Sequence, residues 1–294
     1  MAMVIADPVL GWRKKPGVFK ARNQDIEWTW DIAENGYRRL INAPKTFRKR
    51  AWFFGCSFTE GHCVNIEHSF CYHLQERFED TQITPYAIGG YSSFQNLLQL
   101  EANLVTAKPD VVVFGYFHYH LMRNVSDPAL WRQGTGHPAC RKTDKDSGAG
   151  RHFFRPAALL SEKGRLRYRR IYLPHSKEEM DGMMAYAPDQ FTQYRVGELI
   201  MQRAKRRTEA AGGKFYVAVL RVGDAHQNIQ NLTVPTFEDP FISRLVNKGI
   251  DVIDAVPQRP FEETTFYPVD GHPNAAAHLH FSQTIGDALS GDLS

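Results

Sequence analysis

The segment 51–61 has the sequence AWFFGCSFTEG and places a serine, Ser57, in a turn bounded by Gly55 and Gly61. The apolar residues before Gly55 predict a short buried strand, so the serine follows the carboxyl end of that strand. A serine hydroxyl becomes a strong nucleophile only when a neighbouring base removes its proton. Ser57 is therefore a candidate nucleophile, and a helix N-cap is the alternative interpretation.

The base that activates a serine is usually a histidine held by a carboxylate. The chain has twelve histidines, and His272 is the best placed of them. It lies with Asp270 in the segment DGHPN, a turn between the last predicted strand and the last predicted helix. We expect both residues near Ser57, because the carboxyl ends of parallel strands meet at one edge of a sheet. Asp254 is the less favoured alternative to Asp270.

The elements that must position these residues alternate between strands and helices along the chain. That alternation predicts an α/β protein with a parallel sheet covered on both faces. The closing helix has a proline, Pro273, that we expect in its first turn. The predicted strands are 50–54, 83–88, 109–115, 214–220 and 249–255, and the predicted helices are 67–78, 93–107, 191–211 and 273–289.

Three short segments resemble the conserved blocks of SGNH (GDSL-type) hydrolases. GCSFTEG resembles the first block, Gly-x-Ser-x-Thr-x-Gly; AIGGYSS resembles the second, and DGHPN the last. They occur in family order, and the resemblance spans residues 50–290. It implies a three-layer α/β/α sandwich of flavodoxin-like type. It also implies a Ser57 nucleophile, a His272 base oriented by Asp270, and an oxyanion hole from the N–H groups of Ser57 and Gly90.

The third block of the family departs from its usual form in this chain. The family commonly has Gly-x-Asn-Asp, whose asparagine completes the oxyanion hole, whereas residues 115–118 are GYFH. The asparagine position falls on Phe117 or His118, and only histidine can donate a hydrogen bond. We expect either His118 as the third donor or a weaker hole, with Asn124 as another donor that could reach in. The last block also departs, with one residue between acid and histidine instead of two.

The resemblance implies a serine esterase that hydrolyses short acyl esters, above all acetyl, of a carbohydrate or small alcohol. It implies no metal or organic cofactor. Two alternatives stay open: an acyltransferase that uses the same site with a sugar acceptor, and a catalytically silent member that binds a glycan or protein partner. A cysteine–histidine mechanism through Cys56 and a metal site at His118 and His120 are weaker alternatives. Candidate substrate contacts are Tyr91, Arg123, Asn124, Asp224 and His226.

Composition limits the remaining function classes. The 294 residues carry a formal net charge of +4, and no long basic run indicates nucleic-acid binding. We find neither a secretory signal nor an apolar run long enough for a membrane span, and the four cysteines form no CxxC pair. These features predict a cytoplasmic protein with reduced thiols, while the oligomeric state stays open.

The chain is expected to form one main domain with additions. Residues 1–48 are expected to be an extension packed on the main domain 49–294, which has an inserted excursion at about 126–190. Within that excursion, the basic residues 163–172 predict an exposed strand, with the binding of an anionic substrate as the alternative. On the closing helix, His278 and His280 are expected to be partly exposed.

Overall fold

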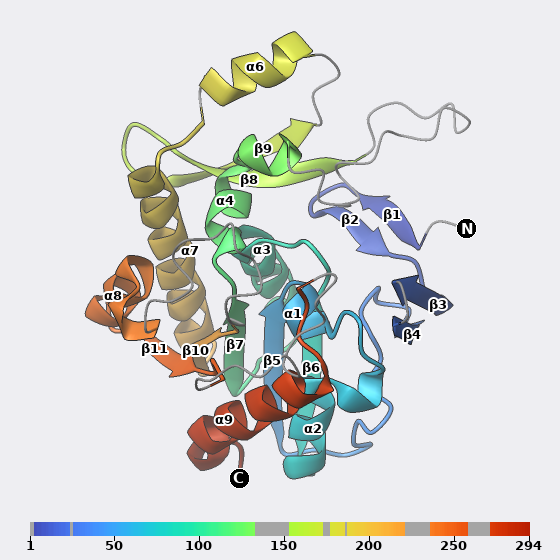
Figure 1. Cartoon of the computed structure of the whole chain (residues 1–294). Coiled ribbons are helices and arrows are strands. Elements are labelled where there is room, and N and C mark those ends of the chain that lie inside the picture. Colours follow the sequence, from blue (N-terminus) through green and yellow to red (C-terminus); the bar gives the residue numbers. More distant parts are fainter. Residues whose placement is uncertain are drawn as a thin grey trace.

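A five-stranded parallel sheet forms the centre of the molecule (Figure 1). The computed structural model describes residues 3–23, 26–132, 153–172, 177–185, 187–220, 236–257 and 271–294. All five predicted strands are confirmed, with ends shifted by a few residues. They are β5 (Lys49–Gly55), β6 (Thr81–Ala87), β7 (Val111–Tyr116), β10 (Lys214–Val219) and β11 (Asp251–Asp254).

In the strand order β11-β10-β7-β5-β6, successive strands are added first on one side of β5 and then on the other. From β5 the chain continues to β6 on one side and then crosses to β7 on the other side of β5. In open α/β sheets, ligands bind at such a switch point, beyond the carboxyl ends of the strands. Only Cys56 separates Ser57 from the end of β5, so the fold places Ser57 at this point.

Helices cover both faces of the sheet. One face carries α2 and α9, and the other carries α3, α7 and α8 (Figure 1). The fold class, a three-layer α/β/α sandwich, is therefore confirmed. The bounds are α2 (Phe70–Arg77), α3 (Ser93–Asn103), α7 (Gln190–Ala210), α8 (Pro240–Asn247) and α9 (Ala275–Leu293).

The side chains of β5 show why both faces are apolar. Ala51 and Phe53 belong to the core under α2 and α9. Trp52 and Phe54 belong to the core under α3 and α7. Successive side chains of a strand point to opposite faces, so an uninterrupted apolar run fits a strand buried on both sides.

Side-chain caps set the helix starts, and they correct two expectations. The predicted helix 67–78 divides into a 3-10 turn, η1 (Ile66–His68), and α2, because the Ser69 hydroxyl accepts from the backbone N–H of Tyr72 and starts a new helix there. Helix α9 begins at Ala275, two residues after Pro273, because Asn274 is the N-cap and accepts from the N–H of Ala277.

The N-terminal residues form two antiparallel hairpins. They are β1 (Val4–Asp7) with β2 (Gly11–Lys14), and β3 (Gly17–Asn23) with β4 (Ile26–Ile32). The first hairpin contacts the segment after β6, where the Tyr91 hydroxyl donates to the Trp12 carbonyl over 2.5 Å and Gln95 donates to the Leu10 carbonyl over 2.8 Å. Turn signals in the sequence did not predict these strands.

The segment between β7 and α7, which includes the predicted excursion at about 126–190, contains helices and a further hairpin. β9 has mostly exposed side chains, as predicted for this basic stretch. No helix in the described ranges combines the length and the apolar character that crossing a bilayer requires. The described elements are α4 (Tyr119–Val125), α5 (Ala129–Arg132), β8 (Phe154–Leu160), β9 (Leu166–Tyr172) and α6 (Lys177–Ala185), and a 3-10 turn, η4 (Thr236–Glu238), precedes α8.

His278 is buried, contrary to the expectation of partial exposure. Its side chain lies between α9 and α2, and its Nδ1 accepts a hydrogen bond from the backbone N–H of Phe70 over 3.3 Å. Burial lowers the pKa of His278 to about 3. The face of α9 that packs on α2 therefore includes one neutral imidazole.

This buried imidazole predicts an acid-sensitive fold. The unfolded chain takes up a proton at His278 as the pH falls below about 6.5, whereas the folded chain does not until about pH 3. Between pH 7 and pH 5, the free energy of unfolding of the wild type should fall by about 2 kcal/mol more than that of a His278→Gln variant. Urea unfolding at both pH values measures this difference. A His280→Gln variant is the control, and equal losses in wild type and His278→Gln would contradict the prediction.

Candidate active site

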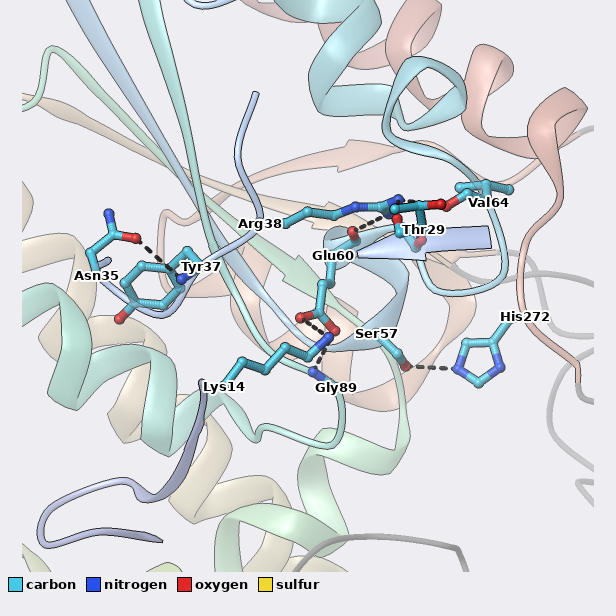
Figure 2. Close-up of polar contacts among 11 residues, drawn as sticks. Lys14, Thr29, Asn35, Tyr37, Arg38, Ser57, Glu60, Val64, Gly89 and His272 are labelled. Carbon is cyan, nitrogen blue, oxygen red and sulfur yellow. Dashed lines mark hydrogen bonds and ion pairs between the residues drawn. The ribbon is translucent and has the colours of Figure 1, made fainter. Parts of the chain in front are cut away.

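Ser57 and His272 are in direct contact, although they lie far apart in the sequence (Figure 2). The distance between Ser57 Oγ and His272 Nε2 is 2.8 Å. Ser57 is the first residue of the short helix α1 (Ser57–Glu60), and His272 lies in the segment that precedes α9. An imidazole nitrogen at this distance can accept the hydroxyl proton. The predicted contact between the two residues is therefore present.

Two glycines allow α1 to pack tightly on the ends of the central strands. A Cβ atom at Gly55, the last residue of β5, would lie 1.9 Å from Thr59 Oγ1, and one at Gly115 in β7 would lie 2.3 Å from the same atom. Either side chain would displace Thr59 and with it α1. The small residues that bracket the switch point thus fix the position of Ser57.

Glu60, at the end of α1, connects the serine turn with the glycine turn that follows β6. Its Oε2 accepts a hydrogen bond from the N–H of Gly89 over 2.8 Å, and its Oε1 lies 2.6 Å from Nζ of Lys14 (Figure 2). Gly90, the next residue, has a φ of +81°, which glycine adopts without steric cost. The Glu60 carboxylate therefore fixes the turn that contains Gly90.

Lys14 supplies the counter-charge for Glu60 from β2 of the N-terminal hairpin. Both side chains are almost completely buried, and the Lys14 ammonium also lies 3.1 Å from the centroid of the Trp30 ring. Burial lowers the pKa of Lys14 to about 8, and the charge of Glu60 opposes that shift. The sequence carried no signal for this pair, because nothing in the local pattern around Lys14 indicates where the hairpin packs.

Arg38 holds the backbone that follows α1. Its guanidinium donates to the carbonyls of Gly61 over 2.6 Å, of Val64 over 2.7 Å and of Thr29 over 2.9 Å (Figure 2). Burial lowers the pKa of Arg38 to about 10. One cation therefore joins β4 to both ends of the segment 61–64, next to the Ser57–His272 contact.

Among the candidate substrate contacts, the side chains of Tyr91 and Asn124 are buried and hold other parts of the fold. Tyr91 is fully buried against Trp12, and Asn124 is buried with its Oδ1 accepting from the N–H of Phe94 over 2.9 Å. Neither side chain is accessible to a substrate in this structure. Arg123 is partly exposed and donates to the carbonyl of Tyr91 over 3.3 Å.

The third block has a phenylalanine in the core and a histidine at a helix start. Phe117 is buried and stacks on Phe58, with ring centroids 4.4 Å apart. His118 is the N-cap residue of α4, and its ring contacts those of Phe117 and Tyr119. His118 as a third oxyanion donor stays a prediction. His120 is buried beside Ser93, and burial holds its pKa well below the usual value.

Of the candidate acids, the structure describes Asp254 but not Asp270. Asp254 accepts from the Thr236 hydroxyl over 2.8 Å and from the N–H of Val256 over 3.2 Å, so it stabilises the turn after β11. Asp270, the predicted partner of His272, lies outside the described residues, as do Asp224 and His226.

Comparison with known proteins supports the fold. No protein-family model matches this sequence, and no curated protein matches it. A member of the lipolytic protein G-D-S-L family from Veillonella parvula is similar in structure, with a TM-score of 0.51 and 13% identity over 82% of this chain and 98% of that chain. At this identity the similarity establishes a shared fold.

Two further solved structures are more distant. The esterase EstA from Pseudoalteromonas has a TM-score of 0.47 and 11% identity over 83% of this chain and 98% of that chain. The acetylxylan esterase Axe2 from Geobacillus stearothermophilus has a TM-score of 0.46 and 12% identity over 82% of this chain and 94% of that chain.

The buried Glu60 pair predicts a large and position-specific loss of stability. Glu60→Ala removes the counter-charge of buried Lys14 and the acceptor for Gly89, so the free energy of unfolding should fall by about 3–5 kcal/mol. Glu60→Gln keeps an acceptor oxygen and should lose less. The control is Glu27→Ala, which breaks an exposed pair with Arg22 and should change stability by no more than about 1 kcal/mol. Urea unfolding measures all three, and similar losses at both positions would contradict the prediction.

Proposed function

We propose that this protein is a serine ester hydrolase of the SGNH type, with Ser57 as nucleophile and His272 as general base. The observation that carries the proposal is the 2.8 Å contact between Ser57 Oγ and His272 Nε2 at the switch point of the sheet. The order of the three sequence blocks and the fold shared with a G-D-S-L family protein support it. A nucleophile, a base and a position beyond the strand ends are the parts that acyl transfer requires.

In the proposed reaction, His272 Nε2 removes the proton of Ser57 while Oγ attacks the ester carbonyl carbon. The tetrahedral intermediate collapses, His272 protonates the departing alkoxide, and the acyl group stays on Ser57. Water, deprotonated by His272, then attacks the acyl-enzyme. The second tetrahedral intermediate expels Ser57 Oγ, which takes the proton back from His272, and the carboxylic acid leaves. Asp270 is proposed to orient the imidazole. No step requires a metal or an organic cofactor.

The oxyanion of the intermediate is proposed to bind the N–H groups of Ser57 and Gly90, with His118 as the third donor. Ser57 opens α1, so its N–H has no acceptor within that helix. The Glu60 carboxylate supports the second donor by holding the N–H of Gly89. One such donor typically contributes about 3–4 kcal/mol of transition-state stabilisation.

The proposed substrates are short acyl esters, above all acetyl esters of a carbohydrate or small alcohol. The resemblance to the family supports this choice, as does the absence of a long apolar stretch near the motifs in the sequence. Transfer of the acyl group to a sugar hydroxyl instead of water would use the same acyl-enzyme. Product analysis with and without an added sugar distinguishes hydrolysis from transfer.

The first test of the proposal removes the nucleophile. Ser57→Ala should lower the hydrolysis of p-nitrophenyl acetate by at least about 10³-fold, because no acyl-enzyme can form. A fluorophosphonate probe should label the wild type at Ser57 and leave Ser57→Ala unlabelled. Ser161→Ala, in the turn between β8 and β9, is the matched control and should keep full activity and labelling. Near-normal turnover by Ser57→Ala, or no labelling of the wild type, would overturn the proposal.

The second test concerns the acyl chain. The ratio kcat/KM should be highest for the acetyl ester and fall steadily through the butyryl to the octanoyl p-nitrophenyl ester. A constant concentration of detergent-free enzyme and substrates below their solubility limits keep the three esters comparable. A preference for octanoyl would contradict the short-chain assignment while leaving the roles of Ser57 and His272 intact.

A further inference from the structure

Three metal-ligating side chains meet on one side of His272. His62 and Cys63 follow α1 directly, and their donor atoms and a ring nitrogen of His272 all lie within 4.8 Å of one another. The rings of His62 and His272 are close, with centroids 4.4 Å apart. Among the described residues, these three side chains form a group whose donor atoms are spaced closely enough to hold a metal ion.

The segment that carries His62 and Cys63 is held from several sides. Cys63 is buried in a small core with Trp28 and Trp30 of β4, and the His62 ring packs edge-on against Trp28 with centroids 4.9 Å apart. Arg38 binds the carbonyls of Gly61 and Val64, which flank the two ligands. Fixed backbone on both sides limits the entropy that would be lost when the donors converge on an ion.

We propose that His62, Cys63 and His272 bind Zn²⁺, and that the bound ion inhibits ester hydrolysis. Two imidazole nitrogens and a thiolate form a ligand set that zinc accepts in tetrahedral sites, with the fourth position left to water. Zinc–nitrogen and zinc–sulfur bonds of about 2.0 and 2.3 Å place such donors about 3.5 Å apart. Side-chain rotations that close a gap of about 1 Å would therefore complete the site.

The inhibitory part of the proposal rests on the function proposed above for His272. A general base must accept the Ser57 proton and become a cation. A zinc ion on either ring nitrogen withdraws electron density from the imidazole and opposes a second positive charge on it. Because one ligand also contacts Ser57, zinc cannot occupy the site without changing the base.

Equilibrium dialysis of the EDTA-treated full-length protein against ZnCl₂ tests the binding. We expect one tight site per chain in the wild type and in Ser57→Ala, which keeps all three ligands. Cys63→Ser and His62→Gln should each weaken that site by at least about tenfold. Cys71→Ser, which alters another buried thiol, and His73→Gln are the matched controls and should bind as the wild type does.

A second readout reports the ligands directly. Co²⁺ in place of zinc should give a thiolate-to-cobalt charge-transfer absorption in the wild type that Cys63→Ser lacks. Thermal melts in EDTA establish that each variant is folded before its metal binding is compared. The metal-site proposal would be overturned if neither Cys63→Ser nor His62→Gln weakened zinc binding. It would also be overturned if Cys63→Ser bound zinc as tightly as the wild type does.

Esterase assays separate this proposal from the proposed function. At a Zn²⁺ concentration about ten times the dissociation constant, p-nitrophenyl acetate hydrolysis should fall about tenfold, and excess EDTA should restore it. Zinc that binds stoichiometrically without lowering turnover would refute the inhibition. A wild type that binds zinc at the three ligands but never hydrolyses esters would refute the esterase and leave the metal site standing.

Discussion

The contact between Ser57 and His272 depends on how closely α1 can approach the ends of β5 and β7. Thr59 occupies space that a side chain at Gly55 or Gly115 would fill, so the two glycines let the short helix settle on the strand ends. Since β11 runs parallel to β10, β7 and β5, the chain that leads to α9 starts from the same edge of the sheet, and His272 can reach Ser57. The chemistry proposed for the protein thus depends on glycine, which has no side chain, at positions 55 and 115.

Buried charge ties the N-terminal hairpins to this edge of the sheet. Lys14 and Glu60 lose their hydration on folding, and their mutual attraction and the N–H of Gly89 offset that cost only while all partners are in place. Arg38 acts in a similar way on the carbonyls around Gly61. A protein built only from the central sandwich would lack these anchors, so the hairpins help to hold the candidate site in place.

The close packing around Ser57 explains how the segment 57–63 could carry both the proposed nucleophile and two of the proposed zinc ligands. His62 and Cys63 lie on the segment that Arg38 holds, directly after the helix that starts with Ser57. Rigid backbone that aligns a nucleophile also aligns any neighbouring donor atoms. In this chain the neighbours are an imidazole and a thiol, two of the ligand types that bind zinc.

Sequence reasoning worked for features that depend on local pattern. The apolar run of β5, the helical spacing of α3 and the order of the motifs are properties of neighbouring residues, and they led to the strands, the fold class and the Ser57–His272 pair. It failed where a residue's environment is set by distant segments. His278 is buried because α2 packs on its side of α9, and Tyr91 and Asn124 are enclosed by elements that no local pattern names.

The amino-acid order by itself therefore determined the alternating elements, the turn that carries the serine and the turn that carries the histidine, because hydrophobic period and turn chemistry are local. The tertiary structure alone decided which charges form a buried pair and which metal-ligating side chains lie beside His272. Lys14 meets Glu60, and His62 and Cys63 meet His272, only after hairpin, helix and final turn have packed together. Packing geometry of this kind is a property of the whole chain and cannot be read from a segment of it.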